Sequence, residues 1–224
     1  MNRRQLLIGL VVIAVIAIGV IAYMVFATPA DEGPTLASGG TAYKVTISAD
    51  DRTMGNPKAP ITMVEYAAPS CPHCAHFDMA MFPFVKKNYI DTGKVYYVFR
   101  VFPLSQVDIA AESMARCLPP GSYFQFIDLL FRNQPKWDPD GYQIPDVHAA
   151  LVDMGRIAGM SAEQVDSCIN DQAANKKAAD VGNYAQTAYN ITGTPTFLVN
   201  GQIAPPFATT DDIKKYLDAV LAQK

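Results

Sequence analysis

The longest apolar stretch of the chain lies at its N-terminus. Residues 6–26 form a run without any charged side chain, preceded by Arg3 and Arg4 and followed by the acidic Asp31. About 20 apolar residues span the hydrocarbon core of a bilayer as a helix, and positive charge before such a helix keeps the N-terminus inside. We therefore predict a signal-anchor over residues 1–27 that leaves the rest of the chain on the outer face of the membrane.

A cleaved signal peptide is the main alternative for this segment. The apolar region of such a peptide is usually only about 7–15 residues long, but the small residues Ala27 and Ala30 would permit cleavage. A twin-arginine signal, weakly suggested by Arg3 and Arg4, and a buried core helix are further alternatives. Each export route places the remaining residues in an oxidising compartment, where disulfides persist.

The segment that follows, residues 28–42, is rich in small, polar and turn-forming residues. This composition predicts a flexible linker between the membrane segment and a folded domain. The linker is too short for a coiled-coil stalk, so we expect the protein to be a monomer.

Short runs rich in β-branched and aromatic residues, 61–67 and 95–101, predict two strands. The first strand contains a single acid, Glu65, which either faces the core below the segment that follows or faces solvent at a strand edge. Apolar residues then recur at helical spacing over 74–89, which predicts an amphipathic helix. Pro83 lies inside this pattern and should kink the helix.

After the second strand, helical periodicity dominates until about residue 190, with breaks at 119–121 and 134–144. Near the C-terminus, a strand and an Asn200-Gly201 hairpin turn precede a helix over about 210–222, with Thr210 as its candidate N-cap. The segments with helical periodicity lie near 107–117, 122–133, 145–158, 161–169 and 171–189, and Ser161 with Gln164 matches a capping box.

Composition narrows the function classes. The 224 residues carry a formal net charge of −3, and half of them are hydrophobic, so the chain can form a substantial core. An acidic balance argues against nucleic acid as the main partner, because proteins that bind it usually carry a basic face.

The candidate chemistry centres on Cys71-Pro72-His73-Cys74, which lies between the end of the first predicted strand and the start of the predicted helix. Pro72 suits the first helical position, because its missing N–H is not needed there. Free backbone N–H groups and the helix dipole favour a thiolate at Cys71, and a protonated His73 would add positive charge beside it. A low-pKa thiol is a good leaving group, so its disulfide is a strong oxidant. Cys74, one turn later, is within disulfide reach of Cys71.

Two other interpretations of this motif remain open. Cys71, His73, Cys74 and His76 could contribute ligands to a zinc site. No second pair of cysteines or histidines at ligand spacing exists in the sequence, and four ligands at one helix start cannot easily surround a tetrahedral ion. A purely structural disulfide between the two cysteines is the other alternative. We therefore predict a redox pair and no metal.

Several further features occur in a fixed order around the motif. They are the 54–60 segment before the strand, Glu65 six residues before Cys71, Asp78 after the motif, and Thr194-Pro195 before the last strand. Together they resemble the DsbA-like branch of the thioredoxin superfamily over residues 43–224. The resemblance implies a thioredoxin-like α/β fold with a helical domain inserted. The two thioredoxin-like parts would cover 43–103 and 191–224, and the insertion 104–190.

The resemblance also implies roles for individual residues. Thr194 and Pro195 would form the loop that faces the cysteine pair and binds the substrate chain, with Pro195 in the cis form rather than in an ordinary trans turn. Glu65 would relay a proton to or from Cys74. We interpret Asp78 as a solvated helix charge and His76 as an exposed helix residue.

The remaining cysteines, Cys117 and Cys168, each lie near the end of a predicted helix. In an exported protein two such thiols are expected to pair, and some DsbA-like relatives from alphaproteobacteria resemble this chain in carrying a second disulfide. Closing a loop of about 50 residues should stabilise the fold by a few kcal/mol. Two reduced buried thiols are the alternative.

These expectations describe an enzyme without a cofactor that introduces disulfides into reduced or unfolded exported proteins. The resemblance implies reoxidation by a quinone-linked membrane protein and a location in the periplasm or at the extracytoplasmic face of the inner membrane. An isomerase or a reductase of the same fold remains an alternative, as does a non-catalytic module that binds peptides.

Overall fold

The computed structural model describes residues 42–223 of the chain. The predicted signal-anchor over 1–27, and the predicted linker as far as residue 41, lie outside these residues. Within the described part, no helix combines the length and the apolar character that crossing a membrane requires.

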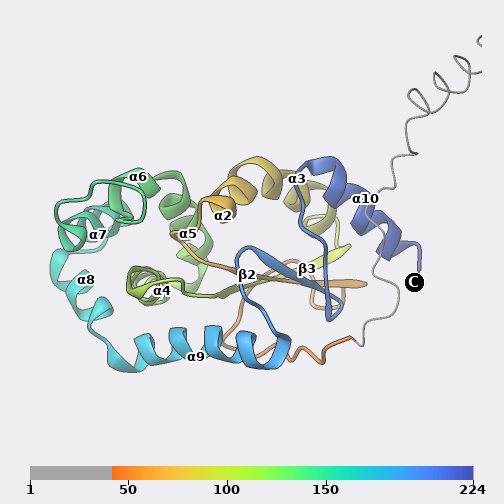
Figure 1. Cartoon of the computed structure of the whole chain (residues 1–224), viewed down its shortest axis with the longest axis horizontal. Helices are drawn as coiled ribbons and strands as arrows, with labels where there is room; N and C mark the ends of the chain where they lie inside the picture. Colours follow the sequence, from red (N-terminus) through yellow and green to blue (C-terminus); the bar gives the residue numbers. More distant parts are fainter. Residues whose placement is uncertain (1–41, 224) are drawn as a thin grey trace, which may run out of the picture. The chain divides into compact units, whose positions relative to one another are not determined.

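A five-stranded mixed sheet with the order β1-β3-β2-β4-β5 lies at the centre of the described part (Figure 1). The parallel pair of β2 (Ile61–Ala67) and β3 (Val95–Val101) confirms both strand predictions. A short strand that the sequence did not predict, β1 (Arg52–Met54), pairs antiparallel with β3. On the other side, β4 (Thr196–Val199) pairs antiparallel with both β2 and β5 (Gln202–Ile203).

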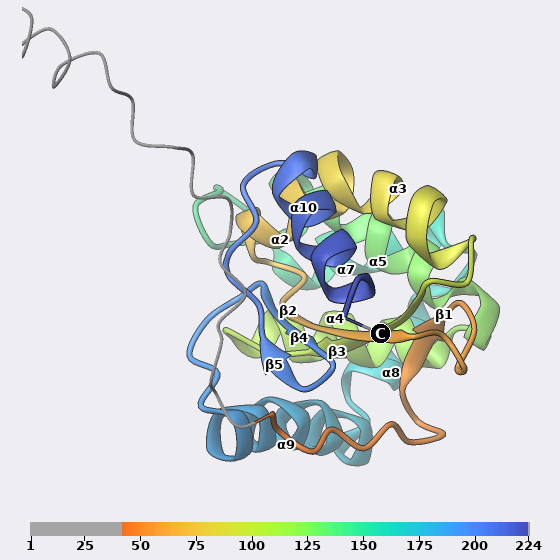
Figure 2. The same cartoon turned by 90° about the vertical axis from the view of Figure 1, so that its right-hand side faces the viewer.

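The sheet separates two cores, because successive side chains of a strand point to opposite faces. On β2, Ile61 and Met63 belong to the larger core, whereas Val64 and Tyr66 belong to the smaller one. The long helix α9 (Gln172–Tyr189) covers the smaller core, and α2, α3 and α10 lie on the opposite face (Figure 2).

The helix that follows the cysteine motif runs without a break from Pro72 to Ile90, but its hydrogen-bond pattern changes along its length. Pro83 lies in its middle and cannot donate a backbone hydrogen bond, which interrupts a regular ladder. Wider π-helical turns, in which the backbone bonds reach five residues, flank this position. The four segments are α2 (Pro72–His76), the π-helical η1 (Phe77–Met81), α3 (Phe82–Val85) and the π-helical η2 (Lys86–Ile90).

The helical insertion lies between β3 and α9, at the end of the sheet that carries the cysteine motif (Figure 1). One short helix lies inside the segment that was predicted as a break. Its residue Trp137 is fully buried and donates from Nε1 to the Leu130 carbonyl at 2.8 Å, which explains why the chain turns there. The elements are α4 (Gln106–Cys117), η3 (Pro120–Ser122), α5 (Tyr123–Arg132), α6 (Gln134–Trp137), α7 (Val147–Ile157) and α8 (Ala162–Ile169).

The C-terminal part follows the sequence prediction with one correction. Asn200 and Gly201 both have positive φ and form the expected hairpin turn between β4 and β5. The last helix, α10 (Thr210–Leu221), is capped by Thr209 and not by Thr210. The reason is the spacing of a capping box. The Asp212 carboxylate accepts a hydrogen bond from the Thr209 backbone N–H, and the Thr209 hydroxyl accepts one from the Asp212 backbone N–H.

The second cysteine pair joins two helices of the insertion. A disulfide links Cys117, the last residue of α4, to Cys168 in α8, with an S–S distance of 2.04 Å. The pairing therefore agrees with the expectation, and the alternative of two reduced thiols does not apply to this structure.

Candidate active site

Cys71 lies at the start of a helix, where backbone N–H groups have no helical partner. It is the N-cap residue of α2, and Pro72 occupies the first turn. The Sγ atom of Cys71 accepts a hydrogen bond from the Cys74 backbone N–H at 3.3 Å and lies 3.4 Å from the Thr194 carbonyl oxygen. Cys71 and Cys74 are both reduced and buried.

The two thiols of the motif titrate in opposite directions. A hydrogen bond from the Cys74 side chain, helped by the backbone N–H groups of Cys74 and His73, lowers the pKa of Cys71 to about 6 against the opposing effect of burial. Burial raises the pKa of Cys74 well above its ordinary value. At neutral pH the site therefore holds one thiolate, at Cys71, and one thiol that can donate to it.

Glu65 lies in the core beneath the motif, with 2% of its surface exposed. The solvent-edge alternative for this residue is therefore wrong. Its hydrogen-bond partner is a phenol rather than a cation, because the Tyr97 hydroxyl donates to Oε2 at 2.5 Å. Burial raises the pKa of Glu65 to about 8, and its negative charge in turn raises the pKa of Cys74. This carboxyl can therefore hold a proton at neutral pH.

The loop before β4 faces the cysteine pair. The Thr194–Pro195 peptide bond is cis, as the resemblance led us to expect. The Thr194 hydroxyl oxygen is shielded from solvent, and the Thr194 side chain helps to lower the pKa of Cys71. His73 and His76 are exposed, and both line a groove of about 510 Å³ that runs beside this loop. The other residues that line it are Phe77, Met81, Thr194, Pro195, Phe197, Pro206, Phe207 and Ala208.

Two buried residues of the insertion hold the segment that carries Cys71. Gln134 donates from Nε2 to the carbonyl oxygens of Pro69 and Cys71, at 2.8 and 3.0 Å. Asp108 accepts from the backbone N–H and the hydroxyl of Ser70, at 2.8 and 3.0 Å. Gln134 and Asp108 were not identified from the sequence. Their neighbours in the sequence give no sign that these side chains will bind backbone groups 38 or more residues away.

Asp78 is the residue whose interpretation the structure corrects. It is only partly exposed, and its Oδ2 atom is shielded from solvent without a hydrogen-bond partner in the described part of the chain. Burial and the neighbouring carboxyl of Asp128 raise the pKa of Asp78 to about 7. The interpretation as a solvated helix charge is wrong, because the wide π-helical turn of η1 and helix α5 pack around this side chain.

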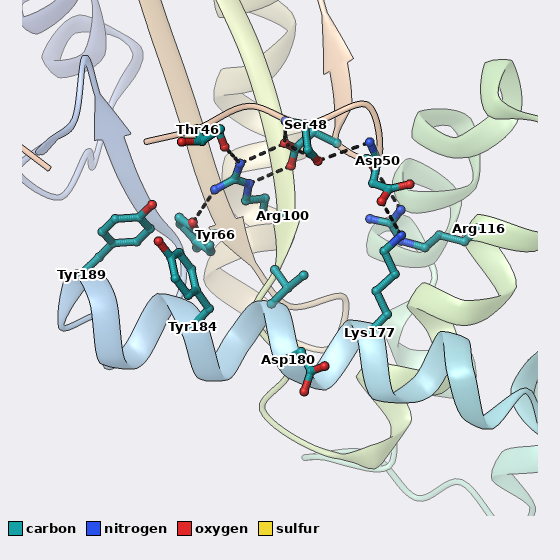
Figure 3. Close-up of a pocket in the computed structure, with 12 residues that line it drawn as sticks. Thr46, Ser48, Asp50, Tyr66, Arg100, Arg116, Lys177, Asp180, Tyr184 and Tyr189 are labelled. Carbon is teal, nitrogen blue, oxygen red and sulfur yellow. Dashed lines mark hydrogen bonds and ion pairs between the residues drawn. The ribbon is translucent and has the colours of Figure 1, made fainter. Parts of the chain in front are cut away.

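Within residues 42–223, no group of three His, Cys, Asp or Glu side chains is arranged to hold a metal ion. A pocket of about 390 Å³ lies on the face of the sheet that α9 covers (Figure 3). Among its lining residues, Arg100, Arg116 and Lys177 each bind an acidic side chain. These contacts hold the 43–51 segment against the sheet and α9, and they do not involve the cysteine motif.

Comparison with known proteins decides the family. A family model described as Thioredoxin matches residues 48–219, which is most of the chain. The chain belongs to the thioredoxin family.

Curated relatives of this thioredoxin-family protein carry names from disulfide chemistry. It is 35% identical over 181 residues to a putative protein-disulfide oxidoreductase of Rickettsia prowazekii, a match that covers 80% of this chain and 65% of the relative. It is 27% identical over 226 residues to a probable disulfide bond formation protein D of Bacillus cereus, with 98% of each chain covered. The chain thus spans about 65% of the length of the Rickettsia relative.

Solved structures place this thioredoxin-family chain among DsbA-like proteins. It resembles the crystal structure of alpha-DsbA1 of Wolbachia pipientis with a TM-score of 0.71 and 27% identity, covering 79% of this chain and 94% of that one. BdbD of Bacillus subtilis in its oxidised form gives a TM-score of 0.65 with 26% identity, over 77% of this chain and 93% of that one. The α/β fold, the helical insertion and the relatives agree on a DsbA-like protein.

Proposed function

We propose that this chain is a thiol:disulfide oxidoreductase that introduces disulfides into reduced exported proteins through Cys71 and Cys74. The observation that carries the proposal is the position of Cys71 as N-cap of α2, where its Sγ accepts a hydrogen bond from the Cys74 backbone N–H at 3.3 Å. This environment lowers the pKa of Cys71 to about 6, whereas burial raises that of Cys74. A stabilised thiolate at Cys71 favours the reduced enzyme, and this makes the oxidised enzyme a strong donor of disulfides.

The reaction begins with the oxidised enzyme. A client thiolate attacks Sγ of Cys71, the Cys71–Cys74 bond breaks, and Cys74 leaves as a thiolate that takes up a proton from Glu65. A second client thiolate then attacks the client sulfur of the mixed disulfide, and Cys71 leaves as a thiolate. Two electrons pass from the client dithiol to the enzyme, and the client keeps a disulfide. The low pKa of Cys71 makes the second step favourable.

The groove beside the cis-proline loop is the site at which we propose that clients bind. Its lining is mostly apolar, with Phe77, Phe197 and Phe207 among its residues, and unfolded chains expose apolar side chains. The Thr194–Pro195 loop lines this groove, and we propose that its backbone bonds the client chain. We assign His73 to the electrostatic environment of the Cys71 thiolate, to which it adds positive charge when protonated, and Pro72 to the first turn of α2.

We propose that the enzyme works as a monomer at the extracytoplasmic face of the membrane, anchored by residues 6–26. The Cys117–Cys168 disulfide supports an oxidising compartment. Returning Cys71 and Cys74 to the disulfide requires an electron acceptor, for which we propose a quinone-linked membrane protein. An anchor would hold enzyme and acceptor in the same membrane plane.

The decisive experiment equilibrates the purified full chain with glutathione buffers and measures the fraction of Cys71–Cys74 disulfide. A potential near about −120 mV supports a donor of disulfides, whereas a potential near about −270 mV would assign the chain to the reductases. A Cys71→Ser variant should lose all transfer of disulfides to a reduced client protein. A Cys117→Ala/Cys168→Ala variant is the matched control, and it should keep the transfer at a lower thermal stability.

A further inference from the structure

The proposed exchange reaction moves a proton that has no direct route to solvent. Cys74 is completely buried, and Glu65 is 2% exposed. Cys74 takes up a proton when it leaves Cys71, and it releases one when the disulfide forms again. A client chain that lies in the groove covers this side of the site. The proton therefore has to cross the protein interior.

A second cavity lies on the other side of the helix that follows the cysteine motif. It has a volume of about 280 Å³, and Tyr97, the hydrogen-bond partner of Glu65, is part of its lining. None of the residues that line this cavity also lines the client groove. The helix between Pro72 and Ile90 separates the two spaces, since Phe77 and Met81 face the groove while Asp78 and Phe82 face the cavity.

Most of the cavity lining is apolar, and Tyr97, Asp78 and Asp128 are among its polar groups. Asp78 lies between the buried pair and the surface, and the carboxyl of Asp128 on α5 lies next to it. Asp128 is at the surface, with 42% of its side chain exposed, and accepts a hydrogen bond from Arg132 at 2.8 Å. Lys86 completes the charged lining and binds Asp91 at 2.7 Å.

We propose that Asp78 and Asp128 relay protons between solvent and the Glu65–Tyr97 pair through this cavity. The inference rests on the proposed function, because only a reaction that protonates and deprotonates Cys74 needs such a route. A cavity of about 280 Å³ is large enough for several water molecules, each of which occupies about 30 Å³ in the liquid. Such waters would join the Tyr97 hydroxyl to the two carboxyls.

The proton balance follows the redox step. When Cys74 leaves Cys71 and takes the Glu65 proton, Glu65 regains a proton by way of the Tyr97 hydroxyl and Asp78, and Asp78 regains one by way of Asp128 from solvent. In reoxidation the protons move outwards along the same groups. Only protons use this route, and the electrons pass at the sulfur atoms. A pKa of about 8 at Glu65 and of about 7 at Asp78 allows transfer in either direction near neutral pH.

The test compares three variants of the full chain: Asp78→Asn, Asp128→Asn and, as matched control, Asp180→Asn. Asp180 and Asp128 are both exposed and both pair with a cation four residues away in the same helix, but Asp180 lies on α9. The oxidised enzyme is mixed with a cysteine peptide at pH values from about 5.5 to 8.5. Free thiols are trapped with a maleimide, and the rate of loss of the Cys71–Cys74 disulfide is measured.

We expect Asp78→Asn and Asp128→Asn to lower the rate roughly threefold to tenfold and to flatten its inflection near the pKa of Asp78, about 7. Added imidazole, a diffusible proton carrier, should restore much of the rate in these two variants. The equilibrium with glutathione should stay unchanged, because a relay alters the speed of proton transfer and not its end point. The Asp180→Asn control should match the wild-type protein throughout.

Two results would overturn the relay. One is a wild-type pH profile in both Asn variants, and the other is a uniform loss of rate that imidazole does not restore. The second result would assign Asp78 a structural role only. A wild-type protein that fails to exchange disulfides at all would instead overturn the proposed function, so the two failures are distinguishable.

Discussion

Neighbouring residues on β2, Glu65 and Tyr66, point to opposite faces of the sheet, and each finds its partner on β3. Glu65 accepts a hydrogen bond from Tyr97, and Tyr66 accepts one from Arg100. The hydrogen bond to Glu65 comes from a tyrosine hydroxyl and not from an arginine. On the Tyr66 face, Arg100 also forms two hydrogen bonds to Asp51, at 2.7 and 2.9 Å.

The two carboxyls respond in opposite ways. Burial raises the pKa of Glu65 to about 8. Burial also acts on Asp51, but hydrogen bonds from Arg100 and Ser48 overcome it and lower the pKa of Asp51. Glu65 is fully buried, and its hydrogen bond from Tyr97 does not offset the effect of burial, so it can carry a proton. Asp51 is less deeply buried, and Arg100 keeps it as a fixed charge.

The largest effect is expected for Glu65→Gln. Glu65 ionises near pH 4.5 in the unfolded chain but only near pH 8 in the folded protein. The free energy of unfolding of the wild type should therefore fall as the pH rises from 4.5 to about 8. The shift corresponds to roughly 4–5 kcal/mol. The variant should therefore match the wild type near pH 4.5 and exceed it above about pH 8. Urea unfolding at several pH values measures this, and parallel stability curves for the two proteins would contradict it.

On the other face, Arg100→Met should destabilise the fold by about 3 kcal/mol, because it leaves a nearly buried carboxylate without its cation. The side chains of Arg100 and Asp51 are only 11% and 9% exposed. The ultraviolet absorbance of the Cys71 thiolate should titrate as in the wild type. Lys86→Met is the matched control, because the Lys86–Asp91 pair is about half exposed and should contribute under about 1 kcal/mol. Equal losses of stability in Arg100→Met and Lys86→Met would contradict a special role for the buried Arg100–Asp51 pair.

A smaller effect is expected for Tyr97→Phe. The Tyr97 hydrogen bond lowers the pKa of Glu65, so its removal should raise that pKa above about 8 and cost about 2 kcal/mol of stability. Infrared spectroscopy follows the protonated carboxyl of Glu65 directly. An unchanged titration of that band would show that Tyr97 does not control the acid.

The smallest effect is expected for Tyr66→Phe, the equivalent change on the opposite face. Arg100 loses one hydrogen bond but keeps Asp51 and the Thr46 carbonyl, so the loss should be about 1 kcal/mol. Neither the Cys71 thiolate nor the Glu65 carboxyl should titrate differently. A shift in either titration would mean that the sheet couples its two faces.

Local patterns explain what the sequence could predict. The β-branched and apolar run 61–67, the strand-to-helix position of Cys71 and the Asn200-Gly201 turn depend on neighbouring residues, and each agrees with the structure. For Glu65 the sequence left burial and a solvent-exposed strand edge open, and the structure shows that it is buried. The cis form of Pro195 was expected only through the family resemblance.

Long-range contacts explain what the sequence could not predict. Strand β1 has three half-buried residues and no apolar alternation. It forms because its backbone pairs with the free edge of β3. The hydrogen bonds of Gln134 join residues 63 and 65 positions apart. Asp78 looked like an ordinary helix charge, since only the arrival of α5 places Asp128 beside it.

Helix α6 has a consequence for how this protein can be observed. Trp137 is the only tryptophan of the sequence and is completely buried. It lies in the same one-turn helix as Gln134, whose side chain bonds the Cys71 carbonyl. Closing the Cys71–Cys74 disulfide should alter the environment of this helix, because Gln134 bonds the Cys71 carbonyl. The single tryptophan therefore lies next to the redox loop, and its emission should report the oxidation state without any added dye.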